Sequence, residues 1–281
     1  MGRYNQTMRR ILAALSVAGA IVLLGCSAPA DPLLTPSITG GCEGGARLLR
    51  PLRFVTYNIK SGLNSSLEEI GDVLADLDAD IVALQEVDRD AARTDHRDQA
   101  QDLADRLGMD SAYAAAVTRP PNGDFGVAIL SRLPFVGVER FDLPSAGSFE
   151  PRVALAADVC VGDSPVRVFA THSDLNPFAR VAQQRALSAL ARPYVGRGVL
   201  VAGDLNDTSD ATGVRALLNT PLVDVGAALD DDATCDGRRI DFVLADDMVA
   251  DGAADMRVID TDASDHFPVV TEAMLHDTTM R

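Results

Sequence analysis

Residues 198–206, Gly-Val-Leu-Val-Ala-Gly-Asp-Leu-Asn, carry the pattern that decides the fold. The first five are apolar or small, which is typical of a short buried strand. Two polar side chains, Asp204 and Asn206, follow where this strand ends, and their spacing puts them on the same side of an extended segment. The pattern therefore predicts a buried strand that delivers a carboxylate and an amide to one edge of a sheet.

Short β-branched runs alternate with helical patterns on both sides of this stretch, which is typical of α/β layering. Apolar residues at helical spacing predict helices over 67–77, 98–107, 179–191 and 212–219. Strands are predicted over 52–57, 81–84, 113–117, 126–130, 135–141, 153–161, 166–170, 198–202, 240–244, 256–259 and 267–274. Because several strands follow one another without a helix, antiparallel pairing is expected. The sequence predicts an α/β fold in which two mostly antiparallel sheets pack face to face with helices outside.

Polar residues recur just beyond the predicted strands. These positions hold Asn58, Glu86, His172, Asp204 with Asn206, Asp241, and Asp265 with His266. Each fragment alone has a structural explanation, because Asn and Asp readily form turns by hydrogen-bonding their own backbone. So many polar fragments at the same kind of position are hard to obtain from turn chemistry, and we interpret them as parts of one site.

The order of these fragments resembles the endonuclease/exonuclease/phosphatase superfamily over about residues 53–275. The most specific part is Gly-Asp-Leu-Asn at 203–206, followed much later by Ser-Asp-His-Phe-Pro at 264–268. The resemblance implies a four-layer α/β/β/α sandwich with its site at one end of the two sheets. It also implies metal-dependent hydrolysis of phosphate esters.

The resemblance implies a metal site with Glu86 as the principal ligand and Asn58 and Asp265 close by. Such an all-oxygen set suits Mg²⁺ or Mn²⁺ and differs from the histidine and cysteine sites of zinc. The ion would polarise a phosphoryl oxygen and shield its charge.

The same resemblance implies roles for the catalytic residues. Asp204, with Asn206 beside it, would orient the attacking water or take its proton. His266, held by Asp241, would reach the same phosphate, and His172 would donate to a non-bridging oxygen. Either Asp204 or His266 can be the base, and we favour Asp204 for water activation.

Three basic residues are candidates for binding the substrate phosphate. Arg152 and Arg93 could each clamp it bidentately, although Arg93 is equally well explained as a flexible surface group. Lys60 stands where nucleic-acid-cleaving relatives often carry an acid. A cation there argues against a second metal close by and is suited to contact a phosphate instead.

The N-terminus reads as a targeting segment. Residues 1–25 combine three arginines with an apolar run and are interpreted as a secretory signal. The run ends at Leu-Leu-Gly-Cys, which resembles the lipobox of bacterial lipoproteins and predicts lipidation of Cys26. Residues 26–46 are interpreted as a flexible tether, 47–276 as the enzyme domain and 277–281 as a tail. A monomer attached to the extracytoplasmic face of the cell membrane is expected.

Cysteine usage allows one disulfide after lipidation of Cys26. We predict a bridge between Cys42 in the tether and Cys235 in an Asp/Gly-rich loop. Cys160, at the end of an apolar strand, is interpreted as a small buried apolar residue.

The charge of the chain limits its substrates. The formal net charge is −16, and Lys60 is the only lysine, so the overall field repels polyanions. Long nucleic acid is therefore a poor substrate, and a lipid headgroup or small phosphoester is the first hypothesis. An extracellular nuclease and a non-catalytic envelope binding protein with the same fold are the alternatives.

Overall fold

The computed structural model describes residues 41–42, 50–119, 122–145, 150–229, 232–250 and 253–273, which all belong to one compact unit. The signal segment, Cys26 and most of the tether lie outside the described residues. In the described part of the chain, no helix has the length and apolar character that a bilayer crossing requires.

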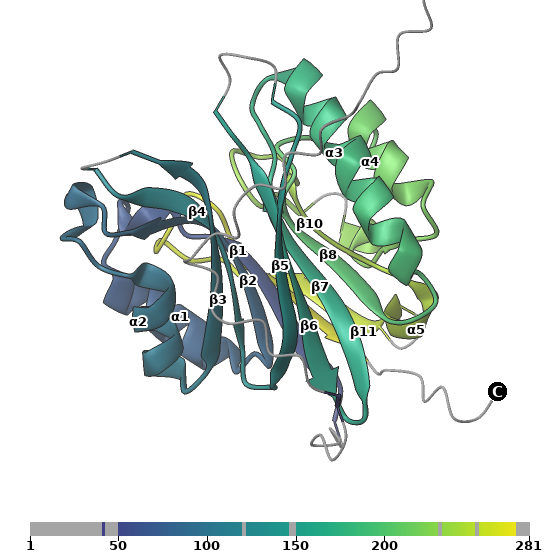
Figure 1. Ribbon diagram of the computed structural model, residues 1–281, viewed down its shortest axis with the longest axis horizontal. Coiled ribbons are helices and arrows are strands. Elements are labelled where there is room, and N and C mark those ends of the chain that lie inside the picture. Colours follow the sequence, from purple (N-terminus) through teal and green to yellow (C-terminus); the bar gives the residue numbers. More distant parts are fainter. Residues whose placement is uncertain are drawn as a thin grey trace, which may run out of the picture. The chain divides into compact units, whose positions relative to one another are not determined.

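Two six-stranded sheets form the centre of the fold (Figure 1). The first has the order β11 (Ala253–Val258), β12 (Val269–Ala273), β1 (Leu52–Asn58), β2 (Ile81–Arg89), β4 (Asp124–Ser131) and β3 (Asp110–Thr118). The second has the order β5 (Phe135–Asp142), β6 (Val153–Val161), β7 (Ser164–His172), β8 (Val199–Asp204), β10 (Asp241–Ala245) and β9 (Val223–Asp224). Each sheet has one parallel pair, β1 with β2 and β7 with β8, and is otherwise antiparallel.

Helices cover the outer face of each sheet. The helices α1 (Leu67–Leu77) and α2 (Gln99–Leu107) pack on the first sheet, and α3 (Pro177–Ala191) and α4 (Thr212–Leu218) on the second. The remaining α-helix of the described residues is the short α5 (Asp247–Ala250). Single-turn 3₁₀ helices occupy Lys60–Gly62, Ala92–Thr94, Arg192–Tyr194 and Ala227–Leu229. The predicted four-layer α/β/β/α arrangement is therefore confirmed.

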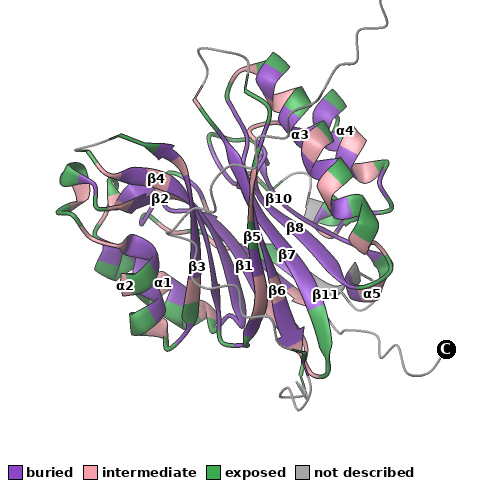
Figure 2. Cartoon of the chain, in the orientation of Figure 1, coloured by how far each residue is buried: buried purple, intermediate pink, exposed green. Residues whose placement is uncertain are grey.

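Three apolar cores hold the layers together, and Figure 2 shows the buried residues along the strands and on the inner faces of the helices. Phe54 and Ile81 of the first sheet meet Leu155 and Leu200 of the second in the central core, and all four are at most 2% exposed. Burying such side chains contributes about 1.5–3 kcal/mol each. Since both strand faces are covered, the strands read as continuous apolar runs, as parallel and sandwiched strands do.

Local signals fix where the outer helices start and stop. Ser66 caps α1 by accepting a hydrogen bond from the backbone of Glu69, whose side chain bonds back to the Ser66 amide. This capping box satisfies two of the amide groups that a helix start leaves open. The helix then turns its apolar residues, among them Ile70 and Leu74, onto the first sheet.

The cysteine prediction is wrong. Cys42 is bonded to Cys160, with 5.3 Å between their Cα atoms, and Cys235 is a buried free thiol. Cys235 pairs with His266 through an isolated β-bridge, whereas Cys160 lies near the other end of β6, eight residues beyond Arg152. At about 3.3 Å per residue, roughly 26 Å of strand separates Cys160 from Arg152. The disulfide therefore attaches Cys42 of the tether to the end of β6 that lies far from the polar strand ends.

Candidate functional site

The polar residues predicted from the sequence converge where the two sheets meet at one end. His172 lies opposite Asp204 in the parallel pair β7–β8, and Asp204 lies opposite Asp241 in the antiparallel pair β8–β10. Asn58 ends β1 in the other sheet and reaches across to Asp204. The topology thus brings together side chains that are far apart in the sequence.

One oxygen of Asp204 is the centre of the site. Its Oδ2 accepts a hydrogen bond from Asn58 Nδ2 at 3.1 Å and lies 3.4 Å from His172 Nε2 and 3.7 Å from His266 Nε2. The residue is only 1% exposed. Its other oxygen, Oδ1, accepts a bond from the backbone of Asn206 at 2.8 Å. A buried carboxylate with this many donors facing it is held in one orientation.

Glu86 joins this centre through Asn58. The Asn58 amide donates to Glu86 Oε1 at 3.0 Å as well as to Asp204. Since these contacts share atoms, Oε1 of Glu86 lies within about 10 Å of His266 Nε2, close enough for one metal-bound phosphate to contact both.

Glu86 stands at a β-bulge of β2 and has a φ of 56°, and Asn206 has a φ of 52°. Left-handed backbone costs a non-glycine residue on the order of 1–3 kcal/mol and tends to occur at functional sites. The bulge interrupts the alternation of β2 just where Glu86 must face the site. The Ser61 hydroxyl donates to the Glu86 carbonyl at 3.0 Å and holds this conformation.

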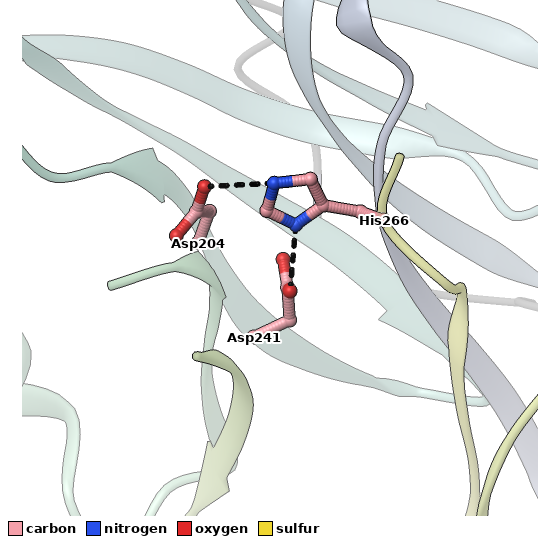
Figure 3. Close-up of side chains that lie close together, drawn as sticks. All are labelled: Asp204, Asp241 and His266. Atoms are coloured by element: carbon pink, nitrogen blue, oxygen red, sulfur yellow. Dashed lines mark hydrogen bonds and ion pairs between the residues drawn. The ribbon is translucent and has the colours of Figure 1, made fainter. Parts of the chain in front are cut away.

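Asp241 and His266 form a buried dyad beside Asp204 (Figure 3). His266 Nδ1 lies 2.9 Å from Asp241 Oδ2, and Nε2 points at Asp204. Burial alone would lower the pKa of His266, but the hydrogen bond and the negative charge of Asp241 outweigh it and raise the pKa to about 9. At neutral pH this ring is therefore a cation with its Nε2–H directed into the site.

The environment of Asp204 suits it to accept a proton. Burial and the charge of Asp241 raise its pKa to about 7, against the opposing effects of His266, Asn206 and Asn58. A carboxyl group with a pKa close to the working pH is matched to general base chemistry. The expectation that favours Asp204 over His266 for water activation is thus consistent with this electrostatic arrangement.

His172 is held as a neutral donor. Arg152 Nη1 lies 3.1 Å from His172 Nδ1, and because a guanidinium only donates, Nδ1 accepts and the ring proton sits on Nε2. Burial, followed by the charges of Arg152 and His266, lowers the pKa of His172 well below its ordinary value. Asn206 Nδ2 lies 3.1 Å from the same Nε2 and donates to the Ser173 carbonyl. Because an amide nitrogen cannot accept, the Nε2–H of His172 is directed at Asp204 Oδ2, 3.4 Å away.

The predicted substrate-binding and metal residues differ in how close they lie to the centre of the site. Arg152 is buried behind His172 and acts on it directly. Arg93 makes two bonds to the buried Asp88 carboxylate, at 2.6 and 2.8 Å, and one to Ser61. Asp265 is exposed and ion-paired with Lys60 at 2.6 Å, a contact that raises the pKa of Lys60. Asp265 and Lys60 therefore form a pair at the rim, while Glu86 and Asn58 lie inside.

Two serines support the site and were missed in the sequence. Ser264 Oγ donates to the Asn58 carbonyl at 2.8 Å, and Ser61 links Glu86 to Arg93. Ser264 belongs to the Ser-Asp-His-Phe-Pro fragment, so its position could have been identified. Ser61 lies in a 3₁₀ turn three residues after the end of β1 and has a φ of 52°, and nothing in the residue pattern indicates its role.

The donor set is compatible with a bound cation. Ligand atoms of Asp204, Asp241 and His266 lie within 4.8 Å of one another. Asp241 Oδ1 is buried and has no hydrogen-bond partner among the described residues, so it could accept an ion without losing a contact. With Glu86 and Asn58 adjacent, the donors are mostly oxygens, as Mg²⁺ and Mn²⁺ prefer. The carboxylate oxygens of this buried group, next to Glu86 and Asn58, could therefore hold a metal ion while His266 stays protonated.

Residues 55–266 match the model of the endonuclease/exonuclease/phosphatase family, and the chain belongs to this family. Its members hydrolyse phosphoester bonds. Among curated proteins, none matches the chain significantly.

Solved structures share the fold. An endonuclease/exonuclease/phosphatase from Beutenbergia cavernae is 26% identical, with a TM-score of 0.67 over 80% of this chain and 72% of that one. A mannosyl-6-phosphatase from Bacteroides thetaiotaomicron is 18% identical, with a TM-score of 0.61 over 80% of this chain and all of that one. An AP endonuclease from Archaeoglobus fulgidus is also 18% identical, with a TM-score of 0.61 over 78% and 98% of the two chains.

Proposed function

We propose that this protein is a Mg²⁺- or Mn²⁺-dependent phosphoesterase that hydrolyses small phosphate esters. The observation that carries the proposal is the single oxygen Asp204 Oδ2, buried and shared by Asn58, His172 and His266. This arrangement offers a base, a neutral donor and a cationic donor around one point. A tetrahedral phosphate with a water beside it needs these three functions.

The chain's own residues account for the proton movements. Asp204 takes a proton from water as the water oxygen bonds to phosphorus. His172 Nε2 donates to a phosphoryl oxygen and stabilises the growing negative charge. The P–O bond to the alcohol breaks, His266 gives its proton to the departing oxygen, and Asp204 returns the water's proton to His266 across the 3.7 Å that separates them.

Glu86 and Asn58 are the residues proposed to hold the metal, which would polarise the phosphoryl group and neutralise part of its charge. Glu86 is half-buried at its bulge, with its carboxylate beside the Asn58 amide. Lys60 supplies a second positive charge at the rim, next to Asp265.

A small substrate is favoured over nucleic acid. The chain carries a net charge of −16 and one lysine, so a long polyanion gains little from counterion release on binding. The mannosyl-6-phosphatase among the structural neighbours shows that this fold can serve a small phosphate ester.

We further propose that the enzyme is exported and anchored by a lipid on Cys26, on the evidence of the signal-like residues 1–25 and the Leu-Leu-Gly-Cys sequence. Globomycin, which blocks lipoprotein signal cleavage, should make a larger precursor accumulate. If the protein's size is the same with and without the drug, Cys26 is not lipidated.

Hydrolysis of bis-p-nitrophenyl phosphate tests the proposed activity. We expect Mg²⁺-dependent release of p-nitrophenol that is lost in EDTA and reduced at least about 100-fold in Asp204→Ala and His266→Ala. His96 and Asp90 provide a matched control, because they form an exposed pair with the same 2.9 Å separation as His266 and Asp241. His96→Ala and Asp90→Ala should retain the activity. Full activity of Asp204→Ala and His266→Ala, or in EDTA, would contradict the assigned site.

A further inference from the structure

A cleft of about 340 Å³ opens beside the site. One wall is the loop that follows β2, with Asp88 and Arg93, and the other is the β3–β4 hairpin, with Arg119, Asp124 and Phe125. None of these residues belongs to the Asp204 centre described above. The size lies at the lower end of the roughly 300–1,000 Å³ usual for small-molecule sites. It suits one substituted ring better than a stretch of polymer.

The cleft adjoins the catalytic residues through two side chains. Phe125 lines it and also lines a narrow hollow that Arg152 and His172 border. On the other wall, Arg93 donates to Ser61, whose hydroxyl is bonded to the Glu86 carbonyl. A phosphate held between Glu86 and His172 would therefore lie next to this cleft, which leaves room for its ester group.

The two walls are held in close contact. Gly123, in the hairpin turn, has a φ of +82°, and a Cβ at this position would lie 2.3 Å from the carbonyl oxygen of Asp90. Only glycine permits both this conformation and this approach of the two backbones. Arg93 also stacks over the Phe125 ring, with 5.5 Å from its guanidinium carbon to the ring centroid. The cleft is thus a formed feature of the fold.

The charges around the cleft balance one another. Arg93 is paired with Asp88 at 2.6 Å, Arg119 with Glu150 at 2.8 Å, and Asp124 with Arg89 at 2.9 Å. Because each guanidinium already faces a carboxylate, the cleft has no surplus positive charge for a second phosphate group. The same pairs offer both donors and acceptors to hydroxyl groups. The Phe125 ring supplies an apolar face.

From this combination we propose that the cleft binds the alcohol part of the substrate, and that this part is an uncharged polyhydroxylated ring of monosaccharide size. The inference rests on the proposed phosphoesterase function and gives it a substrate class, sugar phosphates. Hydroxyl groups would bond to Arg119 and the paired carboxylates, and the C–H face of the ring would pack on Phe125.

The test compares phosphate release from a hexose 6-phosphate and from glycerol 3-phosphate, whose short alcohol leaves most of the cleft empty. We expect kcat/KM to favour the hexose phosphate by at least tenfold in the wild-type protein. In Phe125→Ala and Arg119→Ala this preference should fall about tenfold. Phe178→Ala and Arg106→Ala are matched controls, because Phe178 is 83% exposed outside the cleft and Arg106 forms a surface ion pair with Asp72. Both controls should keep the preference.

Two further substrates test whether the cleft binds a charged group or a nucleobase instead of a sugar. Faster hydrolysis of a hexose 1,6-bisphosphate would show that the cleft selects charge, and faster hydrolysis of a nucleoside 5′-monophosphate would show that Phe125 stacks a base. Either result overturns the proposal, as does an unchanged preference in Arg119→Ala, an exposed residue whose loss should not disturb folding.

If no ester is hydrolysed, calorimetric titration with the hexose 6-phosphate in the presence of Mg²⁺ decides the case. Binding that is weakened at least fivefold in Phe125→Ala and Arg119→Ala supports the sugar site when the proposed activity itself fails. Absence of binding by the wild-type protein in that experiment would refute the sugar site. Loss of bis-p-nitrophenyl phosphate hydrolysis, in contrast, bears on the proposed function alone.

Discussion

Replacing Asp241 with asparagine should remove the cause of the unusual basicity of His266. Asp241 Oδ2 lies 2.9 Å from His266 Nδ1, both side chains are buried, and the pKa of His266 is raised to about 9. Asparagine has nearly the same shape and can still accept a hydrogen bond from Nδ1–H. It cannot supply the negative charge that stabilises the imidazolium.

The expected change follows from the difference between these pKa values. Without the Asp241 charge, burial is opposed only by the smaller effects of Asp204 and Asp265, and the pKa of His266 should fall from about 9 to its ordinary value of about 6.5. A fall of about 2.5 units corresponds to roughly 3.4 kcal/mol of lost stabilisation of the charged ring. At pH 7.5 most of the His266 rings would then be neutral, and we expect phosphoester hydrolysis to drop at least tenfold.

The assay is a pH titration of the His266 Cε1–H signal in ¹H–¹³C spectra of metal-free protein. Asp90→Asn is the control, because it removes the carboxylate from an exposed pair of the same geometry and should leave the His266 titration unchanged. A pKa of His266 that stays above about 8.5 in Asp241→Asn would refute the reasoning.

Three other perturbations follow from the structure. His266→Gln should cost most stability at low pH. Because the folded pKa of about 9 exceeds the ordinary value of about 6.5, the charged pair stabilises fully below pH 6.5 and its contribution is lost as pH rises through 9. Urea unfolding should therefore show the difference from wild type shrinking between pH 6.5 and 9.5, and a difference that grows would contradict this. Cys160→Ser removes a disulfide between residues 118 positions apart and should lower the free energy of unfolding by about 2–5 kcal/mol. Hydrolysis should be unaffected, because the disulfide lies far from the site. Unchanged urea unfolding would argue against the disulfide. Lys60→Ala should raise KM for bis-p-nitrophenyl phosphate about tenfold with a smaller effect on kcat, and an unchanged KM would remove Lys60 from substrate binding.

The fold could be predicted because its signals are local. Residues 198–206 predict a buried strand with a polar end, and the apolar residues of Leu67–Leu77 recur at helical spacing. The short strand Val223–Asp224 was missed, since two residues give no period. Strand β2 runs on to Arg89 beyond the predicted end, because the bulge at Glu86 breaks the apolar pattern without ending the pairing.

The site could be predicted only as a set of residues, because side-chain partners depend on three-dimensional packing. The convergence of Asn58, His172 and His266 on Asp204 follows from strand ends meeting at one edge. No sequence signal distinguishes Asp265, which turns outward to Lys60, from Asp204, which is buried. Likewise, the bridge between Cys42 and Cys160 depends on which end of β6 the arm reaches.

The central claim is that Glu86, Asn58, Asp204 and the two histidines surround one bound metal ion and its phosphate. A crystal structure with Mn²⁺ and inorganic phosphate, using anomalous scattering to locate the ion, tests it most directly. We predict one ion bonded to Glu86, with phosphate oxygens within hydrogen-bonding distance of His172 and His266. An ion and phosphate bound elsewhere, with Glu86 unligated and no phosphate beside the two histidines, would contradict the account.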